Sequence, residues 1–262
     1  IDFGKYAIFG SEESPLTGDT LTLTFGLADG SQSGGGGVGG FQIIEIIQSG
    51  AGPTDIVIDV PSGSQTQAQA GYASIAAANS VMKTGAGTVV FDAANAYTGP
   101  TTVSAGTLEV ANAGALGGTN VTVDTGATLA IASGTTMKSP AVIVDGGTLS
   151  ATTLAVNNTT GITSLAINAG TISGAPVLTV GAGGLASLVQ DARVVVGVGG
   201  LSVDQAGGGG RLDLGAGQIS IAPDGITAAD LRADIIAGRA GGAWTGSTGI
   251  TSSTAAASGG TR

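Results

Sequence analysis

From residue 85 onward, one short phrase recurs along the chain: a glycine, a small or polar residue, and an aliphatic residue that opens an alternating stretch. The aliphatic positions are Val89, Leu108, Leu129, Leu149 and Ile172, about 19 to 23 residues apart. Such a period is typical of the coils of a solenoid. Looser copies follow at residues 185, 201, 212 and 219. Their shorter spacing predicts smaller coils or a taper into a cap.

Within each period, apolar and polar residues alternate, which is the pattern of a short strand with one buried face. Glycine, asparagine and aspartate bound these stretches and supply the turns. The stretches are Val121–Val123, Val142–Val144, Leu154–Val156, Leu165–Ile167 and Leu178–Val180. A single coil cannot bury its apolar face, so neighbouring coils must pair strand on strand. The pattern predicts an all-β fold, a right-handed parallel β-helix (solenoid) over residues 83–222.

Residues 1–82 differ from the repeats because they hold six of the nine aromatic residues and eight of the 18 acidic ones. Alternation predicts strands at Thr20–Phe25, Phe41–Ile47 and Asp55–Val60, while Gln67–Ala78 fits either a short helix or a further strand. We expect an N-terminal β-rich cap or small sandwich, which doubles as a docking region. Its aromatic interface candidates are Phe3, Tyr6 and Phe9.

Residues 223–262 are expected to form a helix and an extended tail. Thr227 precedes Asp230 by three residues, which is the spacing of a capping box at a helix start. An apolar stripe follows at Leu231, Ile235 and Ile236, and Gly238 suits the helix end. We expect this short helix to cap the last coil. Trp244, the only tryptophan, is the fourth interface candidate and is read as core or interface packing.

Composition narrows the chemistry that this chain can perform. Its 262 residues contain neither His nor Cys, which excludes Ser-His-Asp triads, cysteine nucleophiles, disulfides and zinc sites built from these ligands. The net charge of −10 disfavours nucleic acid as a partner. No stretch approaches the ~18 uninterrupted apolar residues of a membrane span. Hydrophobic residues still make up 42% of the chain, enough for a packed core.

Paired carboxylates are the catalytic arrangement that remains, and Asp55 and Asp59 lie four residues apart. Basic residues are scattered in the repeats, so we expect no catalytic residues, no enzyme activity and no cofactor. Calcium is the metal that turn carboxylates would suit, but Asp124 and Asp145 fit ordinary turn chemistry better. Threonines do not form T-x-T pairs coil after coil, which disfavours ice binding.

One part of the chain carries a specific resemblance. The stretches Lys83–Phe91 and Asn95–Leu108 closely resemble the autotransporter-associated β-strand repeat, roughly K-x-G-x-G-T-L followed by N-x-Y-T-G and a second G-T-L. Members of that family are typically secreted or surface-exposed β-helical proteins of bacteria, so the resemblance implies an extracellular or cell-surface location. It covers the repeat and not a transporter barrel, so self-export is not carried over.

A second resemblance lies near the end of the chain. The stretches Leu231–Arg239, Gly241–Gly246 and Gly249–Ser253 are similar to segments that follow such repeats in large extracellular proteins of planctomycete-like bacteria. We therefore expect an extracellular structural protein that self-assembles into a filament, either by head-to-tail stacking of solenoid ends or by strand addition. The partner would be a second copy of the chain. The alternative is a surface adhesin or glycan-binding module, whose partner would be a surface glycan.

Overall fold

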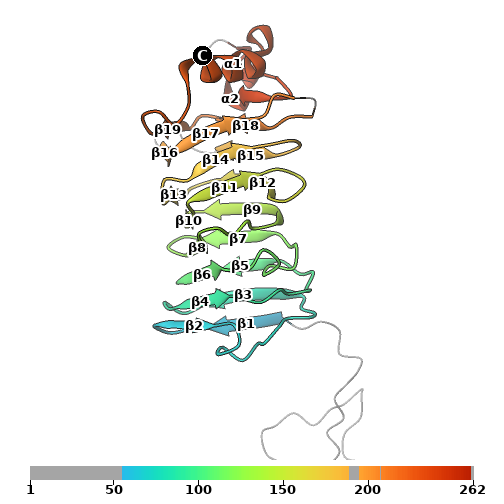
Figure 1. Ribbon diagram of the computed structural model, residues 1–262, viewed down its shortest axis with the longest axis vertical. Helices are drawn as coiled ribbons and strands as arrows, with labels where there is room; N and C mark the ends of the chain where they lie inside the picture. The colour runs from blue at the N-terminus through green and yellow to red at the C-terminus, as the bar shows by residue number, and fades with distance from the viewer. Residues whose placement is uncertain (1–54, 189–194, 207, 261–262) are drawn as a thin grey trace, which may run out of the picture. The chain divides into compact units, whose positions relative to one another are not determined.

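The computed structural model describes residues 55–188, 195–206 and 208–260. These residues wind into a parallel β-solenoid whose coils stack along one axis, with a short helical region at the C-terminal end (Figure 1). The predicted all-β parallel solenoid with a short C-terminal helix is confirmed, while residues 1–54 of the expected N-terminal cap or sandwich lie outside the described residues. The expected strands at 20–25 and 41–47, and the interface candidates Phe3, Tyr6 and Phe9, lie outside the described residues.

The first column of strands runs the length of the solenoid. Its strands pair in parallel, each with the strand one coil further along the chain. They are β1 (Asp55–Asp59), β3 (Ser80–Thr84), β5 (Thr101–Val103), β7 (Val121–Asp124), β9 (Ser139–Asp145), β12 (Ile162–Ile167), β15 (Leu185–Leu188), β18 (Arg211–Asp213) and β20 (Gly249–Thr251).

Two further columns complete the coils. The second column contains β2 (Ser64–Thr66), β4 (Thr88–Phe91), β6 (Thr107–Val110), β8 (Thr128–Ile131), β10 (Thr148–Ser150) and β13 (Thr171–Ser173), followed by the separate pair β16 (Val195–Val198) and β19 (Gln218–Ile221). The third contains β11 (Thr153–Val156), β14 (Val177–Val180) and β17 (Gly200–Val203). The coils before β11 close through turns and loops on this third side.

The recurring phrase of the sequence is explained by the second column. Its five aliphatic residues stack in register, one per coil, and point into the solenoid. The residue before each is a threonine, so Thr88, Thr107, Thr128, Thr148 and Thr171 form a matching ladder on the outer side. Each period therefore supplies one inner apolar rung and one outer β-branched rung, a side-chain type that suits a pleated surface.

The expected taper is wrong. The late copies at residues 185 and 212 belong to the first column, whereas residue 201 lies in the third and residue 219 in the second. These copies are closely spaced because successive ones lie in different columns, on different sides of a coil, and not because the coils are shorter. Along the first column, the paired positions Leu165, Ala186, Leu212 and Ile250 are 21, 26 and 38 residues apart, so the coils lengthen.

The solenoid extends beyond the expected range of 83–222 at both ends. The first coil starts at Asp55, since β1 pairs with β3 and β2 pairs with β4. Its second-column strand carries Ser64 and Gln65 where later coils have Thr and an aliphatic residue, which hides it from a search for the phrase. At the other end, β20 adds a rung after the helix. Gln67–Ala78 forms turns and loop rather than a helix or strand.

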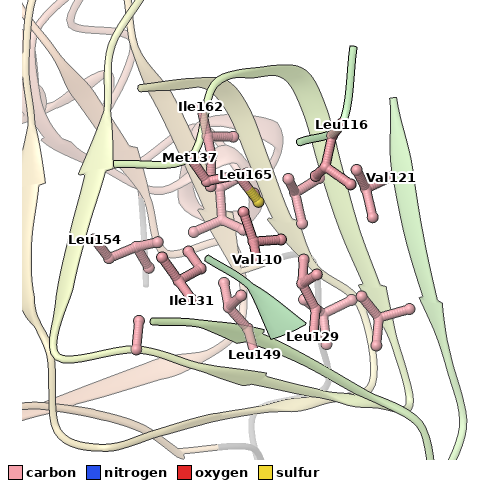
Figure 2. Close-up of a cluster of buried hydrophobic side chains, with 14 of the residues drawn as sticks. Val110, Leu116, Val121, Leu129, Ile131, Met137, Leu149, Leu154, Ile162 and Leu165 are labelled. Carbon is pink, nitrogen blue, oxygen red and sulfur yellow. The ribbon is translucent and has the colours of Figure 1, made fainter. Parts of the chain in front are cut away.

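The core is a narrow lumen filled by inward side chains from all three columns. Leu129 and Leu149 stack between coils, with Ile131, Leu154 and Ile162 packed beside them (Figure 2). Each of these five side chains is at most 8% exposed. Because Val, Leu and Ile are packed at nearly every inward position, coil stacking buries the apolar area that drives folding.

The C-terminal end holds α1 (Ala228–Arg239), the 3₁₀ turn η1 (Ala240–Gly242) and α2 (Ser253–Ala257). Thr227 caps the helix start as predicted: the Asp230 amide donates to the Thr227 hydroxyl at 3.1 Å, and that hydroxyl donates to the Asp230 carboxylate at 2.6 Å. In Figure 1, α1 lies beyond the last rungs of the solenoid. No helix in the described residues is both long enough and apolar enough to cross a membrane.

Only part of the apolar stripe expected from the sequence faces the solenoid, because Leu231 packs partly buried against the core but the two isoleucines do not. Asp234 and Gly238 are the buried residues of α1, whereas Ile235 and Ile236 are 36% and 65% exposed. A Cβ at Gly238 would lie 1.8 Å from the carbonyl oxygen of Ile250. Only a glycine lets the helix backbone approach β20 this closely, so Gly238 is a contact residue and the helix ends one residue later, at Arg239.

Candidate functional site

The most elaborate group of side chains in the described residues is a buried polar network that joins the first coils. Asn95 lies at its centre, in the loop after β4. Its amide exchanges two hydrogen bonds with the buried side chain of Gln67, at 2.8 and 2.9 Å. It also accepts from the Ile75 amide at 2.7 Å and donates to the Ala115 carbonyl at 2.5 Å. One side chain thus connects the loops of three successive coils.

A second part of the network is a chain of hydroxyls around Tyr97, whose side chain is fully buried. The Thr119 hydroxyl donates to the Leu116 carbonyl at 3.0 Å, so it must accept from Thr101, at 3.2 Å. Thr101 in turn accepts from the Tyr97 hydroxyl at 2.6 Å. Burial raises the pKa of Tyr97, against the opposing effect of these hydrogen bonds. The hydrogen bonds thus run in one direction, from Tyr97 to Thr101, from Thr101 to Thr119, and from Thr119 to the Leu116 carbonyl.

Lys83 occupies an inward position of the first column, between Ile58 and Val103 in the ladder. It is 1% exposed. Its ammonium group donates to the carbonyl oxygens of Thr84 at 2.5 Å, Gly85 at 2.8 Å and, from the next coil, Ala105 at 3.2 Å. A lysine that looks like a surface residue in the sequence is therefore a bridge between the turns of two coils.

Burial lowers the pKa of Lys83 below its usual value of 10.5, partly opposed by the charge of Asp59. The unfolded chain therefore holds this proton to higher pH than the folded chain. Stability contributed by Lys83 is full above pH 10.5 and is lost as the pH falls through the folded-state pKa. We predict that the free energy of unfolding of the wild type rises relative to that of Lys83→Met as pH increases toward 10.5.

Urea unfolding of both proteins across the alkaline range measures this difference. Lys138→Met, which removes one positive charge from an exposed position, controls for the change in net charge. A wild-type advantage over Lys83→Met that stays constant with pH would contradict the assigned environment of Lys83.

The structure does not bring the candidate carboxylates together for catalysis. Asp55 and Asp59 both point outward from β1, where they accept from the Ser80 and Thr84 hydroxyls at 2.7 and 3.0 Å. Four residues of extended strand separate them by roughly 13 Å, beyond the ~5–9.5 Å between the carboxylates of glycosidases. Their chemistry here is side-chain pairing along the outer surface of the first two coils.

The turn carboxylates named for calcium stack on neighbouring rungs. Asp124 pairs with Asp145 at the end of β7 and β9. Within the described part of the chain, no group of three or more carboxylates gathers in a way that could hold a metal ion.

Trp244 is the interface candidate that the structure describes. It follows η1, is half-buried, and lines an open pocket of ≈ 320 Å³ at the C-terminal end of the solenoid. Two of the pocket's other walls are the turn after β18 and the first residues of α2. The sequence named the residue but carried no sign of the pocket, because its walls are far apart along the chain.

A comparison with known protein families matches the segment that contains much of this polar network. Residues 82–110 match the family model described as passenger-associated-transport-repeat. This segment runs from β3 to the end of β6 and contains Lys83, Asn95, Tyr97 and Thr101. Neither the curated proteins nor the solved structures gave a match.

Proposed function

We propose that this chain, an autotransporter-associated repeat protein whose passenger-associated-transport-repeat spans residues 82–110, is a secreted structural protein of a bacterial surface. The match to the passenger-associated-transport-repeat supports a secreted, passenger-like β-helical protein. In this role the solenoid holds whatever is attached to its two ends at a fixed separation.

The observation that carries the proposal is the continuous parallel ladder of the first column. It connects β1 to β20 rung by rung without a break. At ~4.8 Å per rung, this ladder spans roughly 40 Å. Backbone hydrogen bonds and apolar stacking act along its whole length, and the Asn95 and Lys83 bridges reinforce the first coils. Such a body resists bending and suits a spacer.

The C-terminal end favours a rod of fixed length over the filament expected from the sequence. Head-to-tail stacking requires an open strand edge at both ends. At the C-terminal end, α1 packs so closely on β20 that Gly238 nearly touches the Ile250 carbonyl. While this helix stays in place, it obstructs addition of a further rung to β20.

Gly238→Ala tests the cap. The added methyl group collides with the Ile250 carbonyl and should displace α1 from β20. We expect the wild type to form discrete particles in electron micrographs and a single sedimenting species, whereas Gly238→Ala associates through the uncovered edge. Gly241→Ala is the matched control, because Gly241 has a positive φ of 74° but open space around it.

If the wild type forms filaments with α1 in place, the proposal of a fixed-length rod is wrong and self-assembly into a filament is favoured instead. The location is tested separately, by labelling intact cells of the source organism with antibodies raised against the purified chain. Signal that appears only after the cells are lysed would overturn the surface assignment.

A further inference from the structure

The pocket beside Trp244 has features that packing of the cap does not require. Its walls are the turn Leu214–Gly217, Trp244, and the residues Thr251, Ser252, Thr254 and Ala255. Its volume of ≈ 320 Å³ is at the small end of ligand pockets in proteins. The lining is mostly apolar, with hydroxyl groups on the α2 side.

The backbone of Trp244 is strained. Its φ is +58°, in the left-handed region where a bulky aromatic residue is an outlier. The nearby residues Gly241, Gly242 and Gly249 also have positive φ, as does Ala240, but Trp244 is the bulkiest residue of this stretch in that conformation. The Trp244 amide donates to the Arg239 carbonyl at 2.9 Å, a bond that glycine would make equally well. A bulky residue in this conformation is a reason to look for a function of its side chain.

Hydrogen bonds hold together the two walls of the pocket that face Trp244, which are the turn after β18 and the start of α2. The Ser252 hydroxyl donates to the Gly215 carbonyl at 2.8 Å and accepts from the Ala255 amide at 3.0 Å. The Asp213 carboxylate accepts from the Gly215 and Ser253 amides at 2.9 and 2.8 Å. These bonds join the turn after β18 to the start of α2, so two walls of the pocket are preorganised.

One polar group in the pocket is left over for a ligand. Thr254 lines the pocket and is half-buried, and its hydroxyl has no hydrogen-bond partner among the described residues. Hydroxyls in partly buried positions are normally paired with protein or water. The pocket thus combines an aromatic residue, a mostly apolar lining and one available hydroxyl.

We propose that this pocket binds a single neutral pyranose ring of a glycan. A pyranose has an apolar C–H face that suits the negative face of the indole ring, and hydroxyls around its edge that suit Thr254. The Asp213 carboxylate at the rim disfavours acidic sugars by charge repulsion. The site is independent of the proposed structural role, because a rod of fixed length needs no ligand at its cap.

Because Trp244 is the only tryptophan in the chain, its fluorescence reports directly on the pocket. Methyl glycosides of glucose, galactose, mannose and N-acetylglucosamine are titrated separately into the full chain. We expect at least one to change the emission saturably, with half-saturation at about 1 mM, as suits a small open site. Thr254→Val keeps the shape and should weaken that response about fivefold. Ile236→Ala, on the exposed side of α1, should leave it unchanged.

Trp244→Gly separates a ligand platform from a packing residue. Glycine relieves the positive φ, so a tryptophan kept for binding predicts an unchanged or higher thermal midpoint, together with loss of the glycoside saturation-transfer signal in NMR. A large fall in the midpoint, with no glycoside altering the wild-type fluorescence, would overturn the proposal in favour of packing. An emission shift that depends on protein concentration without sugar would overturn it in favour of a second copy as the occupant.

Discussion

Gly99→Ala is expected to destabilise the solenoid by about 3 kcal/mol or more. Gly99 lies before β5, where the chain passes directly over the loop of the preceding coil. A Cβ there would lie 1.8 Å from the carbonyl oxygen of Asn79 and 2.2 Å from its carbon. Backbone cannot move aside as a flexible side chain can, so the first coils must separate. At ~2–4 °C per kcal/mol, the thermal midpoint should fall by roughly 6–12 °C.

Two other glycines separate the collision from the loss of backbone freedom. Gly118 has φ +76° with open space around it, so Gly118→Ala should cost about 1 kcal/mol. Gly197 has open space and no positive φ, and its replacement should lie within about 0.5 kcal/mol of the wild type. Thermal unfolding followed by circular dichroism compares the three variants. Equal midpoints for Gly99→Ala and Gly118→Ala would show that the close approach at Asn79 does not exist in solution.

Asn95→Ala should cost about 4 kcal/mol. It leaves the buried Gln67 amide, the Ile75 amide and the Ala115 carbonyl without their partner. Each unpaired buried polar group costs about 1–3 kcal/mol. Asn112→Ala, which removes an asparagine whose side chain bonds only at exposed sites, should cost about 1 kcal/mol or less. Urea denaturation of the two variants measures both values.

A double-mutant cycle tests whether Asn95 and Gln67 act together. Gln67→Ala should cost about 1–2 kcal/mol less in the Asn95→Ala background than in the wild type, because its partner is already gone. If the two substitutions simply add, or if Asn95→Ala costs no more than Asn112→Ala, then Asn95 does not join the coils as the geometry indicates.

Periodicity sufficed to predict the solenoid because each turn of the chain repeats one physical requirement. An aliphatic residue must fill the lumen once per coil, and a turn residue must follow, so Val89, Leu108 and Leu129 recur at nearly constant spacing. Strands such as Val121–Asp124 and Val177–Val180 followed from their alternation alone. Periodicity could not reveal the first coil, because Gln65 stands at its aliphatic position.

The inter-coil contacts could not be predicted, since they depend on which residues of different coils meet. Lys83 is charged, yet the register places it inside the column between Ile58 and Val103. In α1, hydrophobicity pointed to Leu231, Ile235 and Ile236 as the buried face, and of these Leu231 packs against the core while the isoleucines are exposed. The helix also turns the face that carries Gly238 toward β20, because only a glycine allows the close approach to Ile250. Steric fit therefore determined the orientation of the helix more than buried apolar area did.

The short sequence separation between paired strands affects how the chain folds. Most partners in the columns are only 20 to 26 residues apart, so each new coil finds its template in the segment that folded just before it. Folding can therefore spread as a front along the axis, with short loop closures at each step. The Asn95 network ties the first three coils together. Those coils are suited to start the front.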